Sequence, residues 1–458
     1  MARATKKQKV LTAEEKLAAA LVPEAEQPYP VPGNWCWVTV KSINQYDTET
    51  IDPAQSSDET YELYSVPSSS ENYPEIVKGA EIGSTKQKVE KGDVLLCKIN
   101  PRINRVWKVF QHTDNCLLAS SEWIIIRNHG INTEYLMYCF QSPYFRKYML
   151  SNVSGVGGSL MRAQPKYVKN YPVPLPPLVE QQRIVVLVES LFADLDAAKE
   201  KLQTVLDSFA ERRAAILHQA FTGKLTAGWR KEHGMTLSNW TAKRLEDCFD
   251  IVGGIQKQPS RKPDKNPVPY ITVANVYRDR IDLTDLRFFE VFDGEIEKYQ
   301  LHYGDILVVE GNGSGNEIGR CAMWRDELPV CIHQNHIIRV RKKDDSVLPE
   351  YVLYYLNSSM GNQIMKERAR TTAGLYSLST GKIKTIPFPY APINEQKEIV
   401  RILQGLFDAD QQAKATAEAV FADIATMKKS ILARAFRGEL GTGNPADESA
   451  AELLRRVL

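Results

Sequence analysis

The sequence predicts an α+β protein: two mixed α/β segments separated by two long helices that pair as an antiparallel coiled coil, with an internal pseudo-two-fold duplication. The duplication is the first observation, because residues 180–185 return as residues 395–400, which lie 215 positions later. The second is the rhythm of both repeats, in which apolar residues alternate in steps of four and three, the period of a coiled-coil seam. A repeated helix beside two dissimilar segments indicates one architecture used twice.

The bulk composition indicates a soluble globular protein of several domains. The 458 residues are 43% hydrophobic and 25% charged, and a net charge of +2 does not indicate nucleic-acid binding unless basic residues cluster locally. Seven cysteines without a Cys-x-x-Cys pair predict buried free thiols in a reducing compartment and no structural zinc. The sequence shows no signal peptide and no apolar run of membrane length, so we expect a cytoplasmic protein.

Changes of pattern divide the chain into successive segments. They are an N-terminal tail with a short helix (1–32), a first mixed segment (33–171), a linker with a central spacer helix (172–225), a second mixed segment (226–386), a linker with a C-terminal spacer helix (387–440) and a C-terminal tail helix (441–458). The mixed segments echo each other weakly, since the Asn-Trp pair at 34–35 returns at 239–240. Residues 134–150 predict one buried helix. The proline-rich stretches 171–177 and 386–392 predict stiff linkers.

The two long helices are predicted to pair through a heptad seam. About 40 residues at ~1.5 Å each make a rod of roughly 60 Å, so the pair is expected to act as a spacer. The alternative, amphipathic helices packed on a globular core, is disfavoured because the rhythm persists through so many turns. Gly223 and Gly438 stand where a left-handed glycine ends a helix. The seam positions are Ile184, Val188, Leu191, Leu195, Leu202 and Phe209 in the first helix and Ile399, Leu403, Leu406, Val420, Ile424 and Ile431 in the second.

Sequence motifs for catalysis are missing. The Pro-Pro pair at 176–177 is followed by leucine, so the polar-Pro-Pro-aromatic loop of adenine-N6 methyltransferases is absent, and so is a phosphate-binding loop that ends in Gly-Lys-Ser/Thr. The glycine-rich stretch 311–316 lacks that lysine and is either a flexible turn or a backbone cradle for phosphate. His333 and His336 have no accompanying carboxylate or cysteine cluster. We expect no catalytic residue, no metal and no cofactor.

The repeated unit carries a family resemblance. Residues 174–185 read Pro-Leu-Pro-Pro-Leu-Val-Glu-Gln-Gln-Arg-Ile-Val, and residues 391–400 read Ala-Pro-Ile-Asn-Glu-Gln-Lys-Glu-Ile-Val. The helices end in Ala-Phe-Thr-Gly-Lys-Leu at 220–225 and Ala-Phe-Arg-Gly-Glu-Leu at 435–440. With two variable segments between them, these motifs resemble the specificity subunit of type I restriction-modification systems over nearly the whole chain.

The resemblance implies a role without catalysis in the chain itself. Each mixed segment would be a target recognition domain that reads one half of a bipartite double-stranded DNA sequence. The helices would set the spacer and dock two adenine-N6 methyltransferase subunits, which endonuclease and translocase subunits would join. The terminal helices would close the chain into a pseudo-cyclic arrangement. Two other classes stay open: a stand-alone DNA-modifying enzyme with a diverged active site, and an interaction scaffold of the same fold that binds no DNA.

Loops that combine Arg, Lys and amide side chains are the expected DNA contacts, because forked donors read base edges and cations bind phosphates. In the first segment the candidates are Lys98, Asn100, Arg102, Asn104, Arg105, Lys108, Arg162, Gln164 and Lys166. In the second they are Gln256, Lys257, Arg261, Asn312, Ser314, Asn316, Arg320, Arg368, Arg370 and Tyr376. The alternative for each loop is a solvated charged surface.

Overall fold

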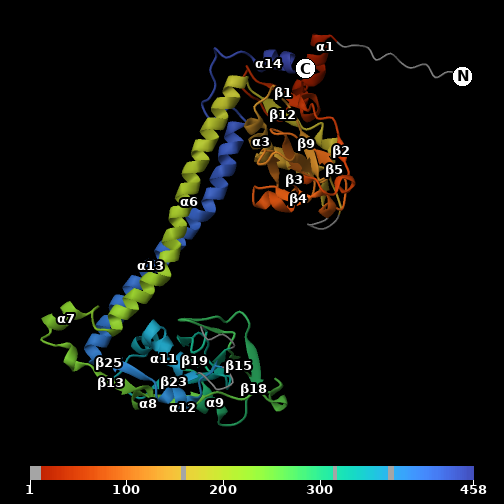
Figure 1. Ribbon diagram of the computed structural model, residues 1–458. Helices are drawn as coiled ribbons and strands as arrows, with labels where there is room; N and C mark the ends of the chain where they lie inside the picture. Colours follow the sequence, from red (N-terminus) through yellow and green to blue (C-terminus); the bar gives the residue numbers. More distant parts are fainter. Residues whose placement is uncertain (1–11, 156–160, 313–316, 370–375) are drawn as a thin grey trace. The chain divides into compact units, whose positions relative to one another are not determined.

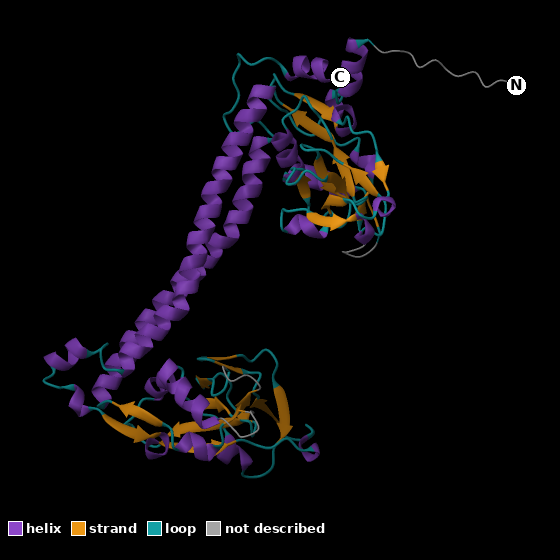
Figure 2. Ribbon diagram, viewed as in Figure 1, coloured by secondary structure: helices purple, strands orange, loops and turns teal. Residues whose placement is uncertain are grey.

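A computed structural model of the chain describes residues 12–155, 161–312, 317–369 and 376–458. The chain divides into two compact units, residues 1–202 with 419–458 and residues 203–418. Each unit contains a module of strands and short helices together with one end of the two long helices (Figure 2). Module 1 is defined here as residues 36–175 and module 2 as residues 241–390.

Module 1 is closed by its first and last strands. β1 (Cys36–Thr39) pairs antiparallel with β12 (Pro172–Leu175) (Figure 1). A sheet of order β7-β6-β9 is formed by Val106–Lys108, Val94–Cys97 and Trp123–Ile126. A second sheet, of order β2-β5-β8-β3-β4, is formed by Thr50–Ile51, Lys86–Lys88, Cys116–Ala119, Thr60–Tyr64 and Glu75–Lys78. Smaller elements are α2 (Val40–Ile43), β10 (Val153–Ser154), β11 (Arg162–Ala163) and α5 (Pro165–Val168).

The single helix predicted for residues 134–150 is wrong, because the structure has two helices there. α3 spans Thr133–Gln141 and α4 spans Pro143–Ser151. Ser142 lies between them and its hydroxyl accepts a hydrogen bond from the backbone N–H of Phe145 at 3.2 Å. Proline has no N–H and clashes with the preceding turn, so Pro143 suits the first turn of a new helix and not the interior of a long one.

Module 2 repeats this plan with different strands. A sheet of order β14-β23-β19-β21 is formed by Phe249–Gly253, Ile337–Lys342, Ile306–Val309 and Cys321–Met323. A sheet of order β18-β15-β22 is formed by Arg287–Glu290, Pro267–Ile271 and Ile332–His333. Paired short strands are β13 (Thr241–Arg244) with β25 (Pro387–Tyr390), β16 (Val276–Tyr277) with β17 (Arg280–Ile281) and β20 (Gly311–Asn312) with β24 (Tyr376–Ser377). The helices are α8 (Leu245–Cys248), α9 (Glu295–Tyr299), α10 (Pro349–Leu356), α11 (Ser359–Ala369) and α12 (Thr380–Lys384).

The duplication extends into the cores of both modules. In module 1, Arg127, the residue that follows β9, donates to both carboxylate oxygens of buried Asp93, at 2.8 and 2.7 Å. In module 2, Arg341 on β23 donates to both oxygens of buried Asp305, at 2.7 and 2.7 Å. Bidentate arginine–carboxylate pairs are among the stronger and more directional polar contacts. The two modules therefore use the same fork to join the start of one strand to the end of another.

The proline-rich stretches are strands as well as linkers, which corrects the sequence-based expectation. β12 and β25 each place proline at alternate positions, and each pairs with the first strand of its module. Alternation suits a strand edge because the residues between the prolines keep the N–H groups that a ladder needs. The entry to each long helix is thus held by strand pairing in addition to proline stiffness.

The predicted antiparallel helix pair is confirmed. α6 spans Leu178–Phe221 and α13 spans Ile393–Ala435. In the first unit Lys428 donates to Asp196 at 2.6 Å, and the Lys199 ammonium lies 5.1 Å from the ring centre of Phe421. In the second unit Arg212 is ion-paired with Asp410. The helix ends are confirmed too, since Gly223 and Gly438 both have a φ of +73°.

The seam of the second helix departs from the predicted register. Leu406 keeps 38% of its surface exposed, whereas neighbouring Phe407 keeps 8%. Val420 is likewise exposed, and Phe421 next to it is half-buried. Residues 399, 403 and 407 are spaced by two successive steps of four, whereas the predicted heptad steps by three from 403 to 406, so the inward stripe departs from the strict heptad here.

The other predicted seam positions differ in how deeply they are buried. Ile184 and Val188 are buried in a core shared with Leu432, Phe436 and module 1. Ile399 and Leu403 are buried in a core shared with Leu217, Phe221 and module 2. Ile424 is buried, and half-buried positions are Leu191, Leu195, Leu202, Phe209 and Ile431.

The two terminal helices lie together in the first unit (Figure 1). α1 (Ala13–Ala20) is capped by Thr12, and α14 (Ala450–Val457) is capped by Ser449. Lys16 donates to the carbonyl oxygen of Leu458 at 3.0 Å. α7 (Ala227–Glu232) provides the connection after α6 in the second unit. Among the described helices, none combines the length and the apolar character needed to cross a membrane.

Candidate nucleic-acid interface

The two candidate loops of module 1 are brought together by backbone hydrogen bonds. The N–H of Asn100 donates to the carbonyl of Met161 at 2.8 Å, and the N–H of Ala163 donates to the carbonyl of Lys98 at 2.9 Å. Ile99 and Arg162 form an isolated antiparallel bridge between these contacts. Loop 98–105 and residues 161–166, which are far apart in sequence, therefore form one surface, here called loop pair 1.

Module 2 contains the equivalent arrangement. β20 pairs antiparallel with β24, and the N–H of Leu378 donates to the carbonyl of Glu310 at 2.6 Å. Leu378 lies 215 positions after Ala163, the same offset as the long helices. We name residues 310–312 with 376–378 loop pair 2. The backbone therefore brings together two distant stretches of each module in a similar way.

Three cations of loop pair 1 are exposed. Arg102 and Lys166 are exposed, and Lys166 lies 4.8 Å from the ring centre of Tyr167. Arg162 forms an ion pair with Glu122 at 3.0 Å, yet 53% of its side chain remains exposed. Exposed ion pairs are weak, so this one costs little to exchange for a phosphate. The half-buried candidates are Lys98, Arg105 and Gln164.

Other candidates of module 1 are held by intramolecular contacts. Lys108 is largely buried in an ion pair with Glu134 on α3. The Asn104 amide donates to the carbonyls of Phe140 and Gln141 at 3.3 and 3.2 Å. Asn100 and Asn104 both have positive φ, of 44° and 54°, a region that asparagine tolerates better than most residues. These asparagines shape the turn.

Module 2 also separates exposed candidates from occupied ones. Gln256 and Lys257 are exposed in the loop after β14. Arg261 donates to both oxygens of Glu295 at 2.9 and 2.7 Å. Arg320 donates to the carbonyl of Val273 at 2.7 Å, and Arg368 donates to the hydroxyl of Thr385 at 2.6 Å. Tyr376 is half-buried against the module core. Ser314, Asn316 and Arg370 lie outside the described residues, and Asn312 is described only as part of β20.

The repeated Glu-Gln motif joins the start of each long helix to its module. In module 1 the Gln181 amide donates to the carbonyl of Pro176 at 2.9 Å and accepts from the backbone N–H of Asn132 at 2.9 Å. In module 2 the Gln396 amide donates to the carbonyl of Ala391 at 2.8 Å and accepts from the backbone N–H of Leu348 at 2.9 Å. Each glutamine thus joins the start of a long helix to the N-terminal end of the module helix α3 or α10.

The histidines near β22 have intramolecular contacts. Nδ1 of His333 lies 2.9 Å from the carbonyl of Ile337, and Nδ1 of His336 lies 2.9 Å from Oε2 of Glu310. Burial lowers the pKa of His333 to about 4. Within the four described ranges, no group of three or more His, Cys, Asp or Glu side chains is placed to hold a metal ion. All seven cysteines lie in those ranges and are free thiols, five of them buried.

Residues that position the loops were missed from the sequence. Arg146 on α4 donates to the carbonyl of Arg102. Glu122, which precedes β9, forms an ion pair with Arg162 through its side chain. Its backbone carbonyl accepts a hydrogen bond from the backbone N–H of Lys98 at 2.9 Å. Neither residue lies in a recognisable motif, and each meets its contact across at least 24 positions of sequence. Only the register of the strands and helices brings them together.

A comparison with known protein families finds two matching regions, one in each half of the chain. A family profile described as the type I restriction modification DNA specificity domain matches residues 32–206 and 237–419. The type I restriction enzyme EcoKI specificity subunit of Escherichia coli K12 is 30% identical over 387 residues, which cover 81% of this chain and 81% of that protein. The StySPI specificity subunit of Salmonella potsdam is 26% identical over 336 residues, which cover 71% of each.

Solved structures share the fold. The crystal structure of the HsdS subunit from Thermoanaerobacter tengcongensis has a TM-score of 0.63 at 21% identity, covering 91% of this chain and 100% of that chain. A chain from a structural study of complex assembly and conformational transition of the type I R-M system has a TM-score of 0.67 at 20% identity, covering 90% and 100%. The enzyme and scaffold alternatives are not favoured by these matches. The chain belongs to the specificity subunits of type I restriction-modification systems, the non-catalytic components that carry DNA recognition.

Proposed function

We propose that residues 33–171 and 226–386, which largely coincide with modules 1 and 2, are target recognition domains and that each reads one half of a split DNA target. The observation that carries the proposal is the repeated loop pair. Ala163 bonds to Lys98 in one module and Leu378 bonds to Glu310 in the other, on the same backbone plan. The side chains around these bonds differ between the modules, as two readers of different sequences require.

In module 1 the proposed contacts are the exposed cations Arg102, Arg162 and Lys166. Arginine pairs bidentately with guanine edges or phosphates, and lysine binds phosphate as a point charge. Lys108 and Asn104 are proposed to hold the loop in shape, because their polar atoms already have partners in the module. The remaining candidates, Lys98, Asn100, Arg105 and Gln164, flank the exposed cations.

In module 2 the proposed contacts are Gln256 and Lys257. Their loop is pressed onto β22, because a Cβ on Gly254 would lie 2.1 Å from the carbonyl oxygen of His333. The glycine therefore permits a close backbone approach that fixes the base of the loop. A glutamine held on a fixed loop is suited to the paired donor and acceptor of an adenine edge. Asn312 and Tyr376 of loop pair 2 are retained as proposed contacts, and so are Ser314, Asn316 and Arg370, whereas Arg261, Arg320 and Arg368 are proposed to support the DNA-contacting loops.

The long helices, within 172–225 and 387–440, are proposed to set the gap between the half-targets and to dock two adenine-N6 methyltransferase subunits. Support comes from apolar side chains on their outer faces, since Val186, Val420 and Met427 are exposed. Val420 and Met427 lie seven residues apart on α13, a spacing that places them on one face of the helix, and clustered exposed apolar side chains are typical of surfaces that bind a protein partner. Endonuclease and translocase subunits are proposed to join that complex, and the assembly is proposed to work in the cytoplasm on double-stranded DNA.

Module-specific variants test the proposal in the assembled methyltransferase. One variant carries Arg102→Ala and Arg162→Ala, the other carries Gln256→Ala and Lys257→Ala, and Lys231→Ala on α7 is the control. The expected result is relaxed base preference in one half of the methylated motif for the first variant and in the opposite half for the second. Equal relaxation of both halves by either variant, with the complex intact, would overturn the assignment.

A further inference from the structure

At the junction of module 2 with the long helices, a cation lies on an aromatic pair. The guanidinium carbon of Arg213 on α6 lies 3.8 Å from the ring centre of Phe407 on α13. Phe407 in turn meets Tyr354 of α10 edge-on, with ring centres 5.6 Å apart. Both rings are buried. The stack therefore joins both long helices to the module.

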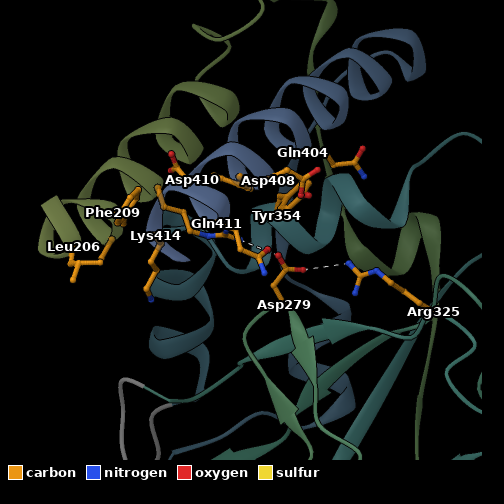
Figure 3. A pocket seen from close by; sticks show the side chains of 13 residues that line it. Leu206, Phe209, Asp279, Arg325, Tyr354, Gln404, Asp408, Asp410, Gln411 and Lys414 are labelled. Carbon is orange, nitrogen blue, oxygen red and sulfur yellow. Dashed lines mark hydrogen bonds and ion pairs between the residues drawn. The ribbon is translucent and has the colours of Figure 1, made fainter. Parts of the chain in front are cut away.

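Arg213 also reaches the module directly. It donates to Oδ2 of Asp279 at 3.0 Å. Arg325 lies 3.6 Å from Oδ1 of the same carboxylate, as Figure 3 shows. Asp279 has a φ of +57° in the turn between β16 and β17. Its backbone N–H donates to the carbonyl of Cys321 at 2.9 Å, which holds the turn on the module. The carboxylate is thus presented rigidly to the helix.

This contact lies at the far end of the junction. The apolar core shared with the module includes Phe221 and Leu217 of α6, and Arg213 lies eight residues before Phe221, or about 12 Å along the helix. A cavity of about 690 Å³ adjoins it, lined by residues that include Gln404, Asp408 and Lys414 (Figure 3). Close apolar packing therefore does not fill this part of the junction. An ion pair far from the apolar core resists rotation of the module about that core more than an ion pair close to it.

The first unit repeats the stack but ties its cation elsewhere. Lys428, which lies 215 positions after Arg213, is 4.9 Å from the ring centre of Phe192. Phe192 meets Tyr138 edge-on with ring centres 5.8 Å apart. Lys428 donates to Asp196 on the neighbouring long helix at 2.6 Å. The equivalent cation thus joins helix to helix in one unit and helix to module in the other.

We propose that Arg213 and Asp279 form a positioning clamp that sets the orientation of module 2 on the helices and, through it, the length of the unread gap between the half-targets. The inference rests on the proposed two-half reader. The clamp itself is proposed to make no contact with DNA. It acts on specificity for the gap, while base preference within each half depends on the loop pairs.

The test uses the full chain assembled with its methyltransferase subunits. The substrates are duplexes whose half-targets are separated by the native gap, one base pair less or one base pair more. Asp279→Gly removes the carboxylate and keeps a residue that accepts the positive φ. Arg213→Gln removes the cation, and Arg213→Lys is the conservative variant. The matched control is Arg212→Ala, which removes an ion pair to Asp410 within the helix pair only.

The expected result is a rise of about fivefold in methylation of the altered-gap duplexes relative to the native gap for Asp279→Gly and Arg213→Gln, the scale of one hydrogen-bonded ion pair. Arg213→Lys and Arg212→Ala should keep the native ratio. Unchanged ratios in assembled Asp279→Gly and Arg213→Gln complexes would overturn the clamp, and so would equal loss at every gap. If the unsubstituted complex ignores the gap altogether, the proposed two-half reader itself fails.

Discussion

The indole N–H of Trp35 donates to Oε2 of Glu180 at 2.9 Å, and the carboxylate is fully buried. The equivalent bond joins Trp240 to Oε2 of Glu395 at 2.8 Å in the second unit. The tryptophan of the repeated Asn-Trp pair therefore donates a hydrogen bond to the glutamate of the repeated Glu-Gln pair in both units. This hydrogen bond joins the residue just before the first strand of each module to the start of a long helix.

The other carboxylate oxygen ties in a different part of the chain. Thr442 donates to Oε1 of Glu180 at 3.2 Å, and Thr226 donates to Oε1 of Glu395 at 2.6 Å. In the second unit Arg230, which is largely buried, also forms an ion pair with Glu395. Each glutamate therefore accepts hydrogen bonds both from the start of a module and from the segment that follows the other long helix.

Replacing these glutamates is expected to destabilise the two units unequally. Glu395→Gln leaves the Arg230 charge buried without a counter-charge, which costs about 3–5 kcal/mol. Glu180→Gln loses one acceptor for Trp35 or Thr442, which costs about 1–2 kcal/mol. Denaturant unfolding of both variants measures the difference. Equal losses in the two variants would contradict the role assigned to Arg230.

The inward face of α13 is tested by adjacent residues. Phe407→Asp places a carboxylate where a buried ring packs on Tyr354 and Arg213, so we expect loss of the folded second unit. Leu406→Asp changes an exposed position and should shift stability by less than about 1 kcal/mol. Thermal unfolding and size-exclusion chromatography of the two variants decide. A tolerated Phe407→Asp together with a disruptive Leu406→Asp would restore the strict heptad register.

Salt dependence separates DNA contacts from structural cations in module 1. Arg162→Ala or Lys166→Ala is expected to lower the slope of log affinity against log salt by about 1 for a duplex carrying the module 1 half-target. Lys108→Ala should leave that slope unchanged and reduce stability, because its ammonium pairs with Glu134. Fluorescence anisotropy at several salt concentrations measures the slopes. A lowered slope in Lys108→Ala alone would reverse the assignment.

Acid sensitivity of module 2 is expected from His333. Burial lowers its folded-state pKa to about 4, below the ordinary value of 6.5. Between these values the unfolded chain binds a proton that the folded chain does not, so stability falls as pH drops from 6.5 towards 4, by up to about 3 kcal/mol. His333→Asn should remove this part of the fall, whereas exposed His302→Asn should not. Unfolding free energies at pH 7, 6 and 5 provide the test, and parallel pH profiles for all three proteins would exclude His333 as the cause.

Features that depend on local chemistry were predictable from the sequence. The repeat gave the paired helices, and Gly223 and Gly438 end them in the left-handed conformation, as predicted. The cap at Thr12 forms with Glu15 three residues later. The glycine ends and the cap depend on residues within one or two helical turns, and the paired helices depend on a repeat that is visible along the chain, so a single sequence contains the necessary information.

Features that depend on distant contacts were not predictable. Lys108 and Arg162 are both cations in candidate loops, but only Lys108 meets a carboxylate on α3 that largely buries it. Asp93 lies 34 positions from the arginine that it pairs with, Arg127, and the two are brought together by the pairing of β6 with β9. The choice between Leu406 and Phe407 likewise depends on Tyr354, which belongs to the module.

One chain is proposed to read two half-targets at a fixed separation. A base-resolution map of N6-methyladenine in host DNA, with and without this chain, is the first test of this proposal. We expect a motif of two short halves around a constant unread gap, lost when the chain is absent. Methylation that does not change, or a continuous motif without a gap, would contradict it.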